Sequence, residues 1–61
     1  MNKSMTSIKM ENVKTNGNIT EFTYEGRKYC VIMGIAQDVK TGELYEMYYD
    51  REFNAQIRKM F

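Results

Sequence analysis

The feature that most constrains this chain is its lack of cross-links, because its 61 residues include one cysteine and no histidine. Cys30 has no partner within the chain for a disulfide, and a structural zinc site is nearly excluded. A chain this short hides only about 60% of the surface that its unfolded form exposes. One small hydrophobic core must therefore hold the fold, and self-association is the remaining source of stability, so we expect a homodimer.

The composition is that of a folded domain, with 43% apolar residues, 28% charged residues and no proline. We expect one small β-domain over residues 1–61, with a flexible segment over residues 1–7. Four charged side chains divide residues 1–15, so we expect neither a signal peptide nor a membrane span. The sequence therefore predicts a cytoplasmic protein without a membrane partner.

Three turn signals divide the chain. Asn16-Gly17-Asn18 is typical of a tight hairpin, since asparagine and glycine tolerate a positive φ. Glu25-Gly26-Arg27 indicates a second reversal, and residues 38–43 form a longer loop in which Gly42 can be left-handed. Before the first turn, Ile8 and Met10 alternate with charged residues, which favours a strand there. These breaks predict four or five strands.

The strongest strand signal covers residues 28–36, which are rich in β-branched and aromatic side chains. One face of such a strand carries Tyr29, Val31, Met33 and Ile35, and the other carries Cys30, Ile32, Gly34 and Ala36. Neither face is polar. This pattern predicts a central strand of a small barrel, or a strand with one face closed by a second subunit.

Residues 44–50 alternate as a half-exposed strand does, whereas the C-terminal residues fit two structures. Phe53, Ile57, Met60 and Phe61 have the spacing of an amphipathic helix that Asp50 could cap. A final strand over residues 57–61 is preferred. The expected fold is all-β or mainly β, a strongly bent antiparallel sheet or SH3-like barrel of four to five strands, with a short C-terminal helical turn as the alternative.

The order of features from Tyr24 to Phe61 resembles a small bacterial domain family of unknown function with an SH3-like barrel. The residues that carry the resemblance are Gly26, the run from Tyr29 to Ala36, Thr41-Gly42-Glu43, Tyr49, Ile57-Arg58 and Met60-Phe61. The family pattern has a histidine, a tryptophan and a proline where this chain has Gln37-Asp38, Gln56 and Lys59. The resemblance implies a compact, bent sheet and no particular activity.

The sequence contains no set of residues suited to catalysis. Without histidine it lacks the usual general base and metal ligand. Cys30 lies in the most apolar segment, so we expect a buried structural cysteine rather than a nucleophile. Carboxylate pairs such as Asp50 and Glu52 fit solvated surface charge better than an acid and base. We expect no enzyme, no cofactor and no metal site.

Tyrosine and methionine are the residues that suggest a function. Both are favoured at protein interfaces, since tyrosine gives a large contact area and methionine adapts to irregular surfaces. The predicted partner-binding residues are Tyr45, Met47, Tyr48, Tyr49 and Phe53. We therefore predict a non-catalytic protein-binding module, homodimeric, of the kind that phages or mobile elements use to block a host or defence protein sterically.

A small nucleic-acid-binding barrel is the alternative, in which exposed tyrosines stack on bases while cations hold phosphates. The cations would be Arg27, Lys28, Arg51, Arg58 and Lys59. Acidic neighbours accompany these residues and the net charge is only +1, so the sequence does not favour this reading.

Overall fold

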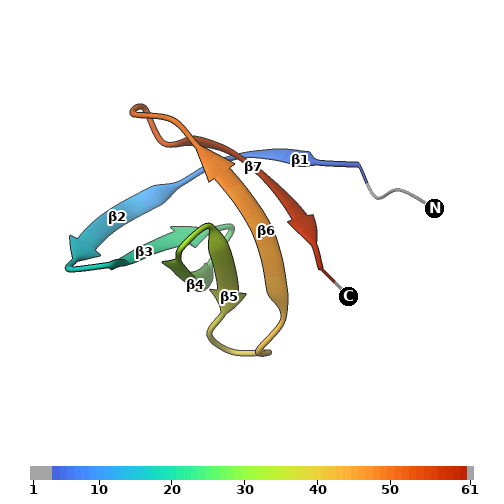
Figure 1. Cartoon of the computed structure of the whole chain (residues 1–61), viewed down its shortest axis with the longest axis horizontal. Coiled ribbons are helices and arrows are strands. Elements are labelled where there is room, and N and C mark those ends of the chain that lie inside the picture. Colours follow the sequence, from blue (N-terminus) through green and yellow to red (C-terminus); the bar gives the residue numbers. More distant parts are fainter. Residues whose placement is uncertain (1–3, 61) are drawn as a thin grey trace.

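The computed structural model describes residues 4–60, which form one antiparallel sheet of seven strands (Figure 1). The strands are β1 (Thr6–Lys9), β2 (Glu11–Asn16), β3 (Ile19–Tyr24), β4 (Arg27–Ile32), β5 (Ile35–Asp38), β6 (Leu44–Tyr49) and β7 (Asn54–Lys59). Their order in the sheet is β1-β7-β6-β5-β4-β3-β2. The prediction of an all-β fold built on a strongly bent antiparallel sheet is confirmed.

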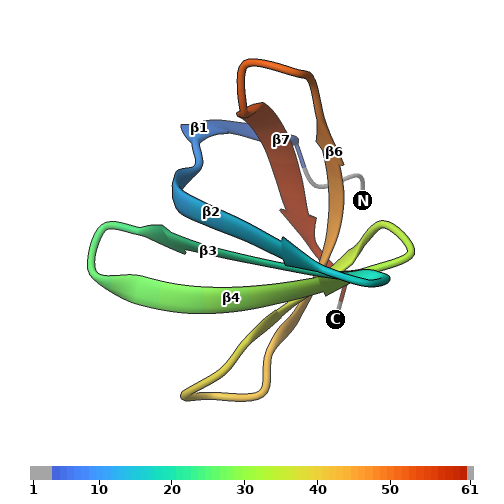
Figure 2. The ribbon, with the colours of Figure 1, turned by 90° about the vertical axis from the view of Figure 1, so that its left-hand side faces the viewer.

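The sheet curls because β1 and β2 are consecutive in the chain yet lie at its opposite edges. Only Met10 separates them, and its N–H donates to the carbonyl of Phe53 (2.9 Å). Asn12 has a φ of 53°, and the β2–β3 register shifts there, as at a β-bulge. Figure 2 shows the result: β2, β3 and β4 cross the direction of β6 and β7, which gives a barrel-like shape.

Two-residue turns join β3 to β4 and β4 to β5. Glu25 and Gly26 both have positive φ angles, as do Met33 (50°) and Gly34 (80°). Two consecutive positive φ values define a type I′ turn, whose twist matches that of the flanking strands. The expected hairpin at Gly17 is also present, with a φ of 66° at that glycine.

The turn between β4 and β5 corrects the prediction of one strand over residues 28–36. The chain reverses at Met33 and Gly34, so that Val31 of β4 pairs with Ala36 of β5. No polar residue marks this reversal, which is why the apolar run suggested a single strand. This reversal and the break at Met10 between β1 and β2 are the reasons why the predicted number of strands, four to five, was too low.

The core lies between the curled halves of the sheet. Its buried apolar residues are Ile8, Met10, Phe22, Tyr29, Val31, Ala36, Met47, Ala55 and Ile57. Phe22 and Tyr29 are cross-strand partners whose rings stack at 5.0 Å, and Tyr45 meets Tyr29 edge-on at 5.9 Å. Aromatic pairs thus hold β3, β4 and β6 together.

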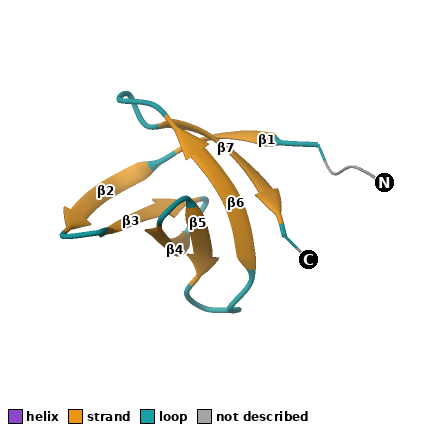
Figure 3. Cartoon of the chain, viewed as in Figure 1, coloured by secondary structure: helices purple, strands orange, loops and turns teal. Residues whose placement is uncertain are grey.

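Both ends of the described chain belong to the sheet. Residues 54–59 form a strand, so the alternative of a C-terminal helical turn is wrong there, and Phe61 lies outside the described residues. Thr6 and Ser7 belong to β1, although residues 1–7 were expected to be flexible; residues 1–3 lie outside the description. Residues 4–60 contain no helix (Figure 3), and hence none able to cross a membrane.

Candidate functional site

Three members of the predicted protein-binding set are exposed. Tyr48 has an exposed fraction of 62%, and Tyr49 and Phe53 are also accessible. Tyr48 lies on the outer face of β6, whereas Tyr49 faces the other side, because successive side chains of a strand alternate. Phe53 lies in the loop between β6 and β7.

The other two members face inward. Met47 is only 2% exposed and lies opposite Ile57, so the prediction that it contacts a partner is wrong. Alternation along β6 places Tyr45 on the same inner side, where it is half-buried and its hydroxyl donates to Glu43 (3.2 Å). Burial, followed by this bond to a carboxylate, raises the pKa of Tyr45.

The outer face of β3, β4 and β5 carries an apolar surface that the sequence did not reveal. Ile19 pairs with Ile32, and Ile32 pairs with Ile35, so the three side chains share the outer face. Ile32 is 47% exposed, Ile19 is exposed, and Ile35 is half-buried.

Met33 and Tyr48 extend this surface. Met33, at the tip of the turn, is 92% exposed. The N–H of Met47 donates to the carbonyl of Gly34 (2.9 Å), which continues the β5–β6 register and brings the turn alongside Tyr48. We call the set of Ile19, Ile32, Met33, Ile35 and Tyr48 the apolar stripe.

The charges at one end of the apolar stripe are already paired within the chain. Glu46 is the register partner of Ile35 and forms an ion pair with Arg58 across β6 and β7. The hydroxyl of Tyr48 donates to the same carboxylate (3.2 Å). The stripe therefore ends on a pair of opposite charges that balance one another.

Cys30 also belongs to the outer face, which corrects its assignment as a buried cysteine. Alternation turns Tyr29 and Val31 inward and Cys30 outward, where it is half-buried. Its thiol lies 3.9 Å from the carboxylate of Glu21, the residue opposite it on β3.

A shallow groove of about 550 Å³ lies over β6, β7 and β1. Tyr24, Tyr48 and Tyr49 line it together with polar side chains such as Asn54 and Gln56. Tyr24 was absent from the predicted set, since it lies more than twenty residues before the tyrosines of β6 and nothing local links them.

The cations proposed for nucleic-acid binding do not form one basic surface. Arg58 pairs with Glu46, and Lys59 pairs with Glu43 (2.7 Å). The hydrogen bond with Lys59 lowers the pKa of Glu43, and the same bond raises the pKa of Lys59. Arg51 makes no ion pair with any residue of the described part, but it lies in the β6–β7 loop, separate from the β3–β4 turn.

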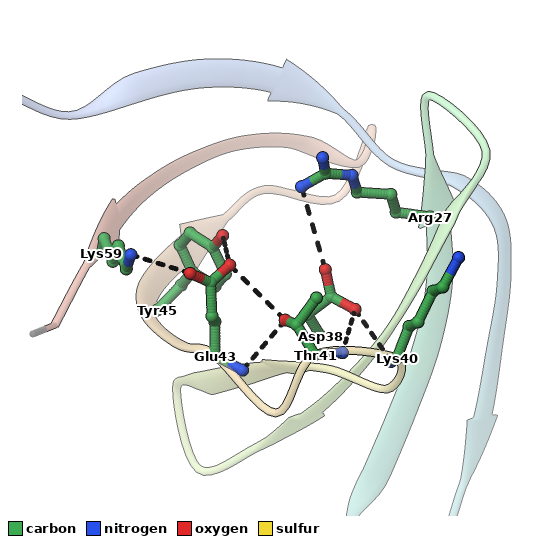
Figure 4. A network of polar contacts seen from close by, with 7 residues as sticks. All are labelled: Arg27, Asp38, Lys40, Thr41, Glu43, Tyr45 and Lys59. Carbon is green, nitrogen blue, oxygen red and sulfur yellow. Dashed lines mark hydrogen bonds and ion pairs between the residues drawn. The ribbon is translucent and has the colours of Figure 1, made fainter.

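Arg27, one of the remaining two cations, lies beside the buried carboxylate of Asp38 (Figure 4), and Lys28 follows it in β4. Asp38 ends β5 and is 1% exposed. Its Oδ1 accepts hydrogen bonds from the backbone N–H groups of Lys40 (2.9 Å) and Thr41 (3.2 Å), which fixes the loop before β6. Within residues 4–60 no group of three or more histidine, cysteine or acidic side chains is placed to hold a metal ion.

Comparison with protein-family models, curated proteins and solved structures finds no match to this chain. The resemblance of residues 24–61 to a small bacterial family therefore stays a prediction.

Proposed function

We propose that this chain is a non-catalytic protein-binding module whose apolar stripe docks against a second copy of the chain. The observation that carries the proposal is the outer-face row of Ile19, Ile32 and half-buried Ile35, with the exposed Met33 at its tip. Contiguous apolar patches on small soluble proteins are typical of interaction sites. Steric inhibition of a host protein, the role predicted from the sequence, would then use a face of the dimer outside the stripe.

The size of the apolar stripe supports this role. Its four exposed side chains amount to roughly 480 Å², if a large side chain presents about 200 Å² when fully exposed. That is close to a tenth of the 4745 Å² surface of the molecule. The largest patches on ordinary monomers reach roughly 300–600 Å², but on much larger surfaces.

A second copy of the chain is the partner that best matches the apolar stripe. A standard interface covers about 800 Å² of each partner, so the stripe would form its apolar centre. Because Glu46 and Arg58 balance each other, the partner needs no net charge of its own, and a two-fold copy presents the same stripe in return. Because the core is small, burial of this area in a dimer would also add to the stability of the fold.

The test is the solution mass of three forms across a dilution series, measured by light scattering. The wild type is expected at twice 7.3 kDa, falling toward one chain on dilution. Ile32→Lys should stay monomeric, because it places a charge at the centre of the interface. Val39→Lys is the matched control: Val39 is an exposed apolar residue outside the stripe, so this variant should keep the wild-type mass.

Two results would count against the proposal. A wild type that is monomeric up to millimolar concentration would exclude the second copy as the partner. A dimer that Ile32→Lys leaves intact would place the interface elsewhere. Circular dichroism of each variant separates loss of association from loss of the fold.

A further inference from the structure

Asp38 has a carboxylate oxygen that the fold buries and does not satisfy. While Oδ1 accepts two backbone N–H groups, Oδ2 is buried and accepts no hydrogen bond from any described residue. A buried acceptor without a donor costs free energy, so its retention calls for a physical reason. The loop would need only Oδ1 to hold its shape.

An open hollow of about 450 Å³ lies beside this carboxylate. One wall is the β3–β4 turn with Arg27 and Lys28, and the other is the loop after β5 with Lys40. The N–H of Val39 donates to the carbonyl of Lys28 (3.0 Å), which fixes the two walls relative to each other. Asp38 is the only acidic residue among those that line the hollow.

The side chain of Arg27 lies between the carboxylate of Asp38 and solvent. Its Nη1 lies 3.9 Å from Oδ2 of Asp38, close enough for an ion pair but too far for a hydrogen bond. A guanidinium carries five N–H groups in a planar fork, so one edge can face Asp38 while the other faces the hollow. Lys28 and Lys40 form no ion pair with the described residues.

We propose that this hollow binds a phosphate monoester. Arg27 and Lys40 outweigh the one carboxylate by a charge of about +1, which favours an anion such as a monoester, whose own charge near pH 7 is about −1.5 to −2. The guanidinium of Arg27 would donate hydrogen bonds to the phosphate from one edge. From its other edge it would move closer to Asp38 and donate to Oδ2, which lacks a donor. Lys40 adds a point charge, whereas alternation along β4 turns the side chain of Lys28 to the outer face with Cys30.

This site is independent of the proposed docking surface. No residue of the apolar stripe lines the hollow, so the two proposals can fail separately. A nucleic-acid backbone differs from a phosphate monoester in its charge per phosphate. Each diester phosphate carries a single negative charge, and these charges are spread along the strand.

The test is a titration of the full chain with phosphoserine at constant ionic strength, followed by amide NMR shifts. Saturable shifts are expected at Arg27, Lys40 and Thr41. Arg27→Gln and Lys40→Gln should each weaken binding roughly tenfold, the effect of losing one charged contact. Arg51→Gln removes a cation elsewhere and should bind as the wild type does. All three side chains are exposed. Because Arg27→Gln removes the ion-pair partner of buried Asp38, circular dichroism of each variant checks that the fold is kept.

Shifts that do not saturate, or an Arg27→Gln variant that binds like Arg51→Gln, would overturn the proposal. The same titration is repeated with a single-stranded oligonucleotide that has no terminal phosphate. If it saturates the same amides at least as tightly as phosphoserine, the site recognises a diester backbone and the monoester assignment is wrong.

Discussion

At the scale of single residues, Met33 combines two unfavourable features. It is the most exposed large apolar residue among those described, and its φ of 50° lies in the left-handed region that side chains other than glycine, asparagine and aspartate rarely adopt. The first position of a type I′ turn favours asparagine. A residue that costs stability in both ways is best explained by a contact that it makes with a partner.

Met33→Asn should therefore separate stability from association. We expect the free energy of unfolding to rise by about 0.4–1 kcal/mol, since asparagine accepts this backbone conformation more readily. The dimer should at the same time dissociate at higher protein concentration, because the tip of the apolar stripe is lost. Urea unfolding under monomeric conditions measures the first effect and light scattering the second. A variant that is less stable would show that the turn is not strained.

Residue patterns predicted the exposed tyrosines but not the stripe that now defines the candidate site. Tyr48 and Tyr49 are adjacent in a strand, so they had to face opposite sides, and local alternation was sufficient. Ile32 and Met33 looked like core residues because their neighbours are apolar. Only Gly34 indicated otherwise, since an isolated glycine within an apolar run can mark a reversal.

At the scale of elements, the turns with polar residues were predictable and the turn without them was not. Gly17, Gly26 and Gly42 all have the positive φ values that their positions in the sequence suggested. The division between β4 and β5 depends on pairing between strands, because β5 forms a ladder with β4 on one side and with β6 on the other. Such pairing overrides the local preference of residues 28–36 for one strand.

The β6–β7 loop is held by one carboxylate, which makes its stability depend on pH. Oδ1 of Asp50 accepts the backbone N–H groups of Glu52 (2.9 Å) and Asn54 (3.0 Å). The bond from Asn54 is the main reason why the pKa of Asp50 is lowered. A lowered pKa in the folded state gives stability that is present above the unfolded pKa and lost as the pH falls through the folded one.

Acid titration of unfolding checks this assignment. The urea midpoint should fall as the pH is lowered from 5 toward 2, and Asp50→Asn should flatten part of that slope. Glu52→Gln changes a neighbouring carboxylate whose side chain accepts no hydrogen bond from the described residues, and should leave the slope nearly unchanged. Equal slopes for wild type and Asp50→Asn would show that the loop bonds do not depend on the charge.

At the scale of the whole molecule, the fold depends on the pairing of its first strand with its last. The other ladders join strands that follow one another in the chain, whereas β1 pairs with β7 across more than forty residues. Ile8 of β1 is buried opposite Ala55 and is part of the core. This contact closes the curled sheet over its apolar interior.

Ile8→Ala should consequently unfold much of the protein. Truncating a buried isoleucine costs about 2–5 kcal/mol, and a core of this size supplies only about 3–5 kcal/mol in total. The far-ultraviolet circular dichroism spectrum at 25 °C should lose its strand signal. Val39→Ala shortens an exposed side chain and should unfold at the wild-type urea concentration. An Ile8→Ala variant that stays folded would mean that the β1–β7 ladder contributes little.

The pairing of β1 with β7 has a consequence for protein synthesis. A ribosome that adds about 5–20 residues per second needs roughly 2–9 s to go from Lys9 to its partner Asn54. During that time the hairpins from β2 to β6 can form one after another as they emerge, while Ile8 has no strand to cover it. The nascent chain is thus open to chaperones and to mispairing until β7 has left the exit tunnel and the sheet can close.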